Sequence, residues 1–190
     1  MTGKSTPLSL RRKIVLIFDQ DILTPTQVSS ETDELYERSY KSAYKMAAWT
    51  ALNICHKDND HIFLTCCIKE DKIFDPAVVS EIINNIFSDE EVKIDKKSIV
   101  EAHFEKIKDM LVAKGISASV DIHVGNDSTA TDIIHAHRAN LVVAQPAEMS
   151  ALGKTFSLDW AETLSRSSIC PITIVRGNDI DDSVLSQVGL

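Results

Sequence analysis

The sequence is poor in the residues that build disulfide frameworks, metal centres and glycine-rich phosphate loops. Its 190 residues include only four cysteines and six glycines. The cysteines are Cys55, Cys66, Cys67 and Cys170. They show neither zinc-ligand spacing nor a Cys-x-x-Cys pair, so we expect buried free thiols, and neither a structural metal nor a disulfide framework.

Long apolar runs and large basic clusters are also missing from the sequence. The first apolar run, Ile14 to Phe18, is far too short to cross a membrane, and residues 1–10 do not resemble a signal peptide. The formal net charge is −8, and the longest basic cluster, Arg11 to Lys13, suits the solvated start of a strand. We therefore expect a cytoplasmic protein that binds neither nucleic acid nor membrane.

Short apolar runs do occur, and they alternate with helical patterns. Residues 13–19, KIVLIFD, are typical of a strand buried on both faces of a parallel sheet. Further strands are predicted over residues 61–68, 116–124, 140–144 and 171–175. Helices are predicted from about residue 30 to 54, over residues 99–111 with Gly115 as the C-cap, from about residue 125 to 137, and over residues 157–165. This alternation predicts an α/β fold with a parallel sheet, right-handed crossovers and helices on both faces.

The length of the chain suits one domain with a full hydrophobic core. We expect an N-terminal arm over residues 1–11, an α/β domain over residues 12–176 and an acidic C-terminal tail over residues 177–190. Residues 69–97 have the least regular pattern, and we interpret them as a surface insertion in the domain.

Several strings in the sequence resemble the universal stress protein family. They are KIVLIFD, which ends at Asp19, SAYKMAAWTALNI in the first helix, VGN after the third strand, NLVVAQ at the fourth strand and SSICPITIVR at the end. The last string is the sharpest match, because Cys170-Pro171 leads directly into the apolar run ITIV. The resemblance extends from Arg12 to Arg176. It implies a single doubly wound domain, like that of adenine-nucleotide-binding proteins, with a five-stranded parallel sheet of order 3-2-1-4-5.

The phosphate loop of that family is altered in this sequence. ATP-binding members carry Gly-x2-Gly-x9-Gly-Ser/Thr after the fourth strand, and here the same spacing holds Gln145, Glu148, Leu158 and Asp159. Glycines let backbone N–H groups approach phosphate oxygens. Glu148 and Asp159 would instead each repel a phosphate, by about 1 kcal/mol in water, and Lys154 offsets only part of that repulsion. The sequence therefore predicts a degenerate nucleotide site.

Other interpretations of these polar residues stay open. Glu148, Lys154 and Asp159 also suit a solvated loop and a helix start, where the helix dipole favours Asp159. Asp19 matches the aspartate that lines the adenine pocket in the family, and it equally suits a cap for the loop that follows.

Catalytic and metal sites have little support in the sequence. Asp132 and His135 share a predicted helix face and could supply two metal ligands, but His137 lies well round that helix, so we expect no metal site. No serine, histidine and acid have the spacing of a nucleophilic site, so we expect no enzyme activity.

The resemblance leads to a first functional hypothesis, a universal-stress-protein-like homodimer that binds no ATP or other cofactor and acts through a protein partner in the stress response. Its dimer contact is expected at the edge strand formed by Ile172, Thr173, Ile174 and Val175, because an exposed apolar edge must be covered or paired. One alternative is a protein that binds ATP or AMP with magnesium and hydrolyses it weakly at most, with Asp19 at the base and Lys154 at the phosphates. Another is a structural subunit of a larger assembly.

Overall fold

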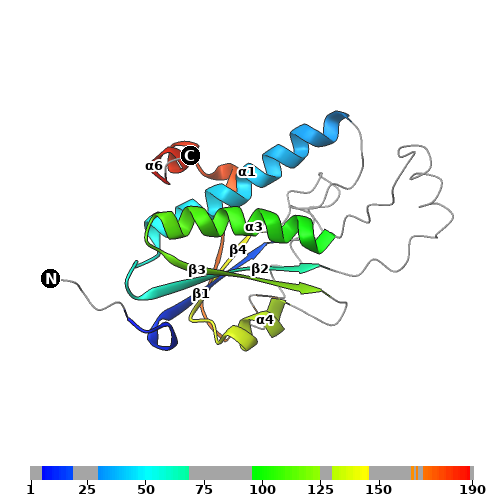
Figure 1. Ribbon diagram of the computed structural model, residues 1–190. Helices are drawn as coiled ribbons and strands as arrows, with labels where there is room; N and C mark the ends of the chain where they lie inside the picture. Colours follow the sequence, from blue (N-terminus) through cyan, green and yellow to red (C-terminus); the bar gives the residue numbers. More distant parts are fainter. Residues whose placement is uncertain are drawn as a thin grey trace.

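The structure, a computed structural model, describes most of the predicted domain (Figure 1). The described residues are 6–18, 30–68, 96–124, 130–145, 164, 166 and 169–188, and for residues 30–40 only the backbone is described. Most of the predicted insertion and of the predicted helix over residues 157–165 lies outside them. The last two residues of that insertion, Lys96 and Lys97, belong to a helix.

Five parallel strands form one sheet of order β3-β2-β1-β4-β5, as predicted. The strands are β1 (Arg12–Phe18), β2 (Asp60–Ile68), β3 (Ser117–Val124), β4 (Leu141–Gln145) and β5 (Ile172–Ile174). Strand β1 lies at the centre, where Val15 pairs with Phe63 of β2 on one side and with Val142 of β4 on the other.

Helices cover both faces of this sheet (Figure 1). The described elements outside the sheet are α1 (Ser30–Asn53), α3 (Lys96–Ala113), α4 (Ala130–His137), α6 (Ser183–Val188) and the 3-10 turns η1 (Leu8–Leu10) and η3 (Gly177–Asp179). Helices α1 and α3 lie on one face, and α4 lies on the other. None of the described helices is long and apolar enough to span a membrane.

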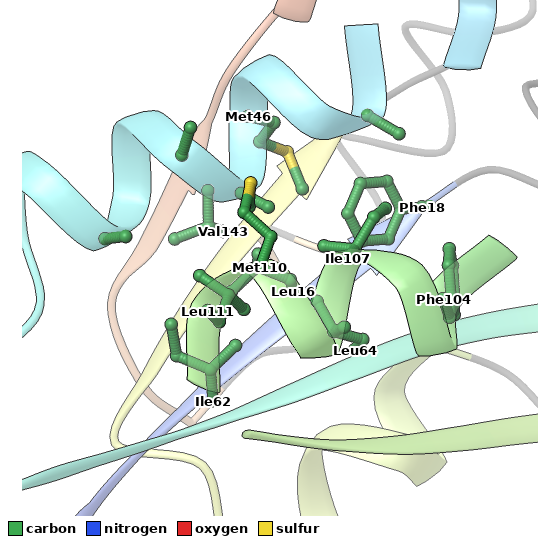
Figure 2. Packing of buried hydrophobic residues seen from close by; sticks show 14 of the residues in the cluster. Leu16, Phe18, Met46, Ile62, Leu64, Phe104, Ile107, Met110, Leu111 and Val143 are labelled. Atoms are coloured by element: carbon green, nitrogen blue, oxygen red, sulfur yellow. The ribbon is translucent and has the colours of Figure 1, made fainter. Parts of the chain in front are cut away.

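The residues of β1 enter two separate cores because successive side chains of a strand point to opposite faces. Ile14, Leu16 and Phe18 pack under α1 and α3, whereas Val15 and Ile17 pack towards α4. All five are buried, as the continuous apolar pattern predicts. Figure 2 shows the larger core, which combines side chains from the strands with side chains from α1 and α3. Its labelled members are Leu16, Phe18, Met46, Ile62, Leu64, Phe104, Ile107, Met110, Leu111 and Val143.

The end of α3 follows the predicted capping pattern. Gly115 has a φ of 77°, the left-handed conformation that glycine adopts most readily. Its N–H donates to the carbonyl of Val112, and the N–H of Ile116 donates to that of Leu111. The helix therefore ends where the sequence indicates, and the chain turns directly into β3.

A charged pair joins the amino-terminal ends of β1 and β2. The buried carboxylate of Asp60 accepts hydrogen bonds from Nε and Nη2 of Arg12, at 2.9 and 2.6 Å, and from the backbone N–H of His56 at 2.8 Å. Burial alone would raise the pKa of Asp60, but the hydrogen bonds from Arg12 and His56 outweigh it, and the pKa is lowered. Asp60 therefore ties the turn before β2 to the first strand.

None of the four cysteines forms a disulfide in the structure, and of the four thiols expected to be buried only that of Cys66 is fully buried. Burial raises the pKa of the Cys55 thiol to about 11. This thiol is therefore protonated and unreactive at neutral pH.

The segment predicted as an acidic tail is folded against α1. It forms η3 and α6, and both contact α1. Its apolar side chains join the larger core with the spacing of one helical face, a signal in the sequence that the prediction did not use. These side chains are Ile180, Val184, Leu185 and Val188. Asp182 forms ion pairs with Lys41 and Lys45 of α1. The folded domain thus extends beyond Arg176 to Val188.

Candidate functional site

The strand order places a switch point between β1 and β4. From β1 the chain continues to β2 and β3 on one side, whereas β4 and β5 lie on the other side. Ligands of open α/β sheets bind outside the carboxyl ends of the strands at such a point. The last residues of β1 and β4, Phe18 and Gln145, are paired there. Gln145 therefore marks the edge of the candidate site.

The side chain of Gln145 is directed into the protein. Along β4, Val143 packs in the core beneath α1, and Gln145 follows two residues later on the same face. Only 1% of Gln145 is exposed, and its Nε2 group donates a hydrogen bond to Oγ of Ser42 in α1. The sequence analysis did not connect Ser42 with Gln145, because the two residues are 103 positions apart and share no local pattern.

A second contact covers Ser42 from the C-terminal segment. A Cβ atom added to Gly177 would lie 2.2 Å from both the backbone oxygen and Oγ of Ser42. The backbone of η3 therefore approaches α1 as closely as glycine allows. Gln145 and Gly177 together enclose the Ser42 hydroxyl between the sheet and the C-terminal segment.

One polar atom at this site has no partner within the described part of the chain. Oε1 of Gln145 is buried there and accepts no hydrogen bond. A buried acceptor of this kind costs about 1–3 kcal/mol if it stays unpaired. Among the described residues, it is the buried side-chain atom at the switch point that still lacks a hydrogen-bond donor.

The other residues predicted for the nucleotide site lie outside the described residues. These are Asp19, Glu148, Lys154, Leu158 and Asp159. The structure thus places one of the six predicted site residues, and it adds Ser42 and Gly177 as its neighbours.

The predicted dimer strand is shorter than expected. Val175 follows the end of β5, and its side chain is buried, so it does not belong to an exposed edge. Ile172 and Thr173 are partly buried, whereas Ile174 is 48% exposed. The N–H of Val175 donates to Ala144 of β4. Because successive N–H groups of a strand point to opposite sides, the N–H of Ile174 faces away from β4.

The predicted pair of metal ligands on α4 is not completed by a third residue. Among the described residues, Asp132 and His135 belong to no group of three potential ligands, and both are exposed. His137 does belong to such a group, together with Asp121 and His123 of β3.

Comparisons with known proteins support the fold. No protein-family model matches the sequence, and no curated protein matches it. Among solved structures, a universal stress protein family protein from Arabidopsis thaliana with AMP bound has a TM-score of 0.50 and 11% identity, and the match covers 92% of this chain and 98% of that one. Two further structures match with slightly lower TM-scores. A universal stress protein in complex with cAMP has a TM-score of 0.48 and 13% identity, and the match covers 88% of this chain and 99% of that one. A universal stress protein from Lactobacillus plantarum has a TM-score of 0.49 and 11% identity, and the match covers 87% of this chain and 99% of that one.

The likeness extends over nearly the whole length of the Arabidopsis chain, and it includes the sheet order that the resemblance implied. Because the two sequences are only 11% identical, the likeness shows a shared fold and nothing more specific. The protein therefore has the α/β fold of the universal stress proteins.

Proposed function

We propose that this protein is a universal stress protein that does not bind ATP, and that it acts as a homodimer through contacts with a protein partner rather than by catalysis. One observation carries the proposal. Gln145, at the position of the first phosphate-loop glycine, is an ordinary strand residue whose amide is bonded to α1.

The backbone at Gln145 supports this proposal as well. Among the described residues, the only non-glycine residue with a positive φ is Arg138. Gln145 therefore does not adopt the conformation that glycine makes available for phosphate binding. Its side chain also fills space that a glycine would leave free for a ligand.

Magnesium ATP should raise the melting temperature of the protein by less than about one degree. Binding with a dissociation constant one hundredth of the ATP concentration would add about 2.7 kcal/mol of stability. For a chain of this length that corresponds to a shift of about 5 to 11 °C. A thermal denaturation series with and without ATP measures the difference, and a shift of several degrees would contradict the proposal.

A variant that restores the motif tests the cause of the lost binding. It carries Gln145→Gly, Glu148→Gly, Leu158→Gly and Asp159→Ser, and the single variant Gln145→Gly is its control. Both lose the hydrogen bond to Ser42, so the shift caused by ATP is compared rather than the melting temperature itself. A melting shift with ATP that appears only in the fourfold variant supports loss of the phosphate-binding motif as the cause of the lost ATP binding. If the folded fourfold variant gains nothing, the base pocket around Asp19 has been lost as well as the phosphate motif.

A second candidate function is binding of an adenine nucleotide with a single phosphate. The unpaired Oε1 of Gln145 favours it, because a donor group of a bound nucleotide could satisfy this acceptor. The Arabidopsis protein with the same fold was solved with AMP bound. A melting shift with AMP that Asp19→Ala abolishes would support this function over the first. Native mass spectrometry separates both from a structural subunit, which would be recovered in a larger hetero-complex.

The dimer contact is expected at Ile174. Its exposed side chain and outward N–H lie on an edge strand that a second copy could pair with. Ile174→Lys should therefore convert a dimer to a folded monomer in light scattering. Leu52→Lys, at an exposed position of α1, is the matched control and should remain dimeric. A wild-type monomer at tens of micromolar would contradict the proposed dimer.

A further inference from the structure

A polar strip lies on the sheet face that carries α4. Strand β3 is the edge of the described sheet opposite β5. On one of its faces Ala118, Val120 and Ile122 pack against the larger core. The alternate residues therefore point to the other face. These residues are Ser117, Ser119, Asp121 and His123.

The end of α4 brings a histidine onto this strip. The helix ends at His137, and Arg138 follows with a φ of 52°, so the chain turns sharply there. Nε2 of His137 lies 2.9 Å from Oδ2 of Asp121, and Nε2 of His123 lies 3.2 Å from the same oxygen. The three candidate ligand atoms all lie within 4.8 Å of one another.

These separations suit a tetrahedral metal ion. Zinc–nitrogen bonds of about 2.0–2.1 Å place neighbouring ligand atoms about 3.3 Å apart. The two distances to Oδ2 of Asp121 are close to that value. The ligand atoms of His123 and His137 lie within 4.8 Å of each other, and a rotation of the more exposed His123 ring would bring both within bonding distance of one ion that also contacts Asp121.

The position of His137 is fixed by its neighbours. Its ring packs against Phe63, with the ring centroids 4.2 Å apart, and the ring of His61 packs on Phe63 at 4.5 Å. Both ring nitrogens of His61 are bonded to serines of β3, Nδ1 to Ser117 and Nε2 to Ser119, so this histidine orders the surroundings and is not a free ligand.

His137 carries a polar ring atom that the rest of the described protein leaves unsatisfied. Its Nε2 atom is buried and, within the described part of the chain, has no hydrogen bond of suitable direction, although the Asp121 carboxylate is near.

Exposure increases from one potential ligand to the next. The side chains of His137, His123 and Asp121 are 12%, 25% and 43% exposed. An ion held by the three would therefore have protein on the His137 side and solvent on the Asp121 side, where water can complete its coordination.

We propose that Asp121, His123 and His137 form a binding site for a divalent transition-metal ion, with Zn²⁺ as the best match. Two imidazoles and one carboxylate suit zinc, whereas magnesium and calcium prefer a shell of oxygen ligands. The site lies on the α4 face at the β3 edge, and it does not depend on the proposed function of the switch point.

Calorimetric titration with zinc chloride tests the proposal on the full chain after dialysis against EDTA. The wild type should bind one zinc ion per chain at this site. His123→Asn and Asp121→Asn should each weaken that binding by about 100-fold, because each removes a direct ligand and even changes behind the ligands cost 10–100-fold. His135→Asn, on the exposed face of α4, is the matched control and should bind zinc as the wild type does.

Cobalt spectroscopy identifies the ligand type. Co²⁺ bound at this site should give visible absorption bands without the charge-transfer band of a thiolate, and His123→Asn should lose them. The β3 variants are preferred because His137 also packs on Phe63. Zinc affinity that is equal in the wild type and both β3 variants, a thiolate band, or no binding to the folded wild type would each overturn the proposal.

Discussion

Replacing Gly177 with alanine should lower the free energy of unfolding by about 3 kcal/mol, at the upper end of the usual cost of overpacking. The added Cβ would lie 2.2 Å from two atoms of Ser42 and 2.7 Å from its carbonyl carbon. Two of these three atoms belong to the backbone of α1, so rotation of a side chain cannot relieve the clash. The C-terminal segment must shift, and Ile180 and Val188 then lose part of their burial.

Gly115→Ala is the control for this result. The nearest atom to a Cβ at Gly115 is Cδ of Lys57 at 4.0 Å, so there is room for it. Its positive φ should still cost about 1 kcal/mol. Urea denaturation of the two variants separates a steric cost from a conformational one. Equal losses of stability would show that η3 does not pack on α1 as described.

Replacing Asp60 with alanine should lower the free energy of unfolding by about 3 kcal/mol, the lower end of the range for breaking a buried ion pair. The lower end applies because the Arg12 side chain is 39% exposed and can be hydrated once its partner is gone. The variant also leaves the N–H of His56 without its acceptor. Asp58→Ala, an exposed change in the same turn, should have little effect in the same denaturation assay.

The stability that the wild type has over Asp60→Ala should decrease at acidic pH. The folded pKa of Asp60 is lowered, so its stabilisation is fully present above the unfolded pKa of about 3.9 and disappears as the pH falls through the folded pKa. The difference between wild type and variant should therefore be constant from about pH 5 to pH 8 and shrink below about pH 4.

A second acid-sensitive group, His61, is present in both the wild type and Asp60→Ala, so its effect cancels in the stability difference between them. Burial lowers the pKa of His61 to about 4. The unfolded chain binds the His61 proton more readily, so both proteins lose stability as the pH falls from about 6.5 to 4. A wild-type advantage that grows below pH 4 would contradict the role of the Asp60 carboxylate.

Local patterns were sufficient to predict the strands of the sheet and the helices α1, α3 and α4. The apolar run of β1 and the C-cap glycine of α3 each depend on a few neighbouring residues, and the structure confirms both. The order of the strands came from the resemblance to a family, and the structure confirms it as well.

The contacts at the candidate sites could not be predicted from local sequence patterns. The hydrogen bond between Gln145 and Ser42 joins residues that are 103 positions apart in the sequence. Gly177 has no distinguishing pattern in the sequence, and only its contact with Ser42 of α1 shows why a side chain does not fit there. His137 was considered only with residues of its own helix, whereas its potential co-ligands lie on β3. Such contacts arise from the packing of whole elements, which sequence periodicity does not specify.

The contact between α1 and the C-terminal segment has a consequence for how the chain folds. Lys41 and Asp182 are 141 residues apart, and the core beneath α1 includes Val188. Contacts between distant residues slow folding, because a long loop must close before they are formed. On the ribosome, α1 emerges early but remains without its last packing partners until residue 188 has left the exit tunnel. This face of the domain is therefore closed only after α6 has been synthesised.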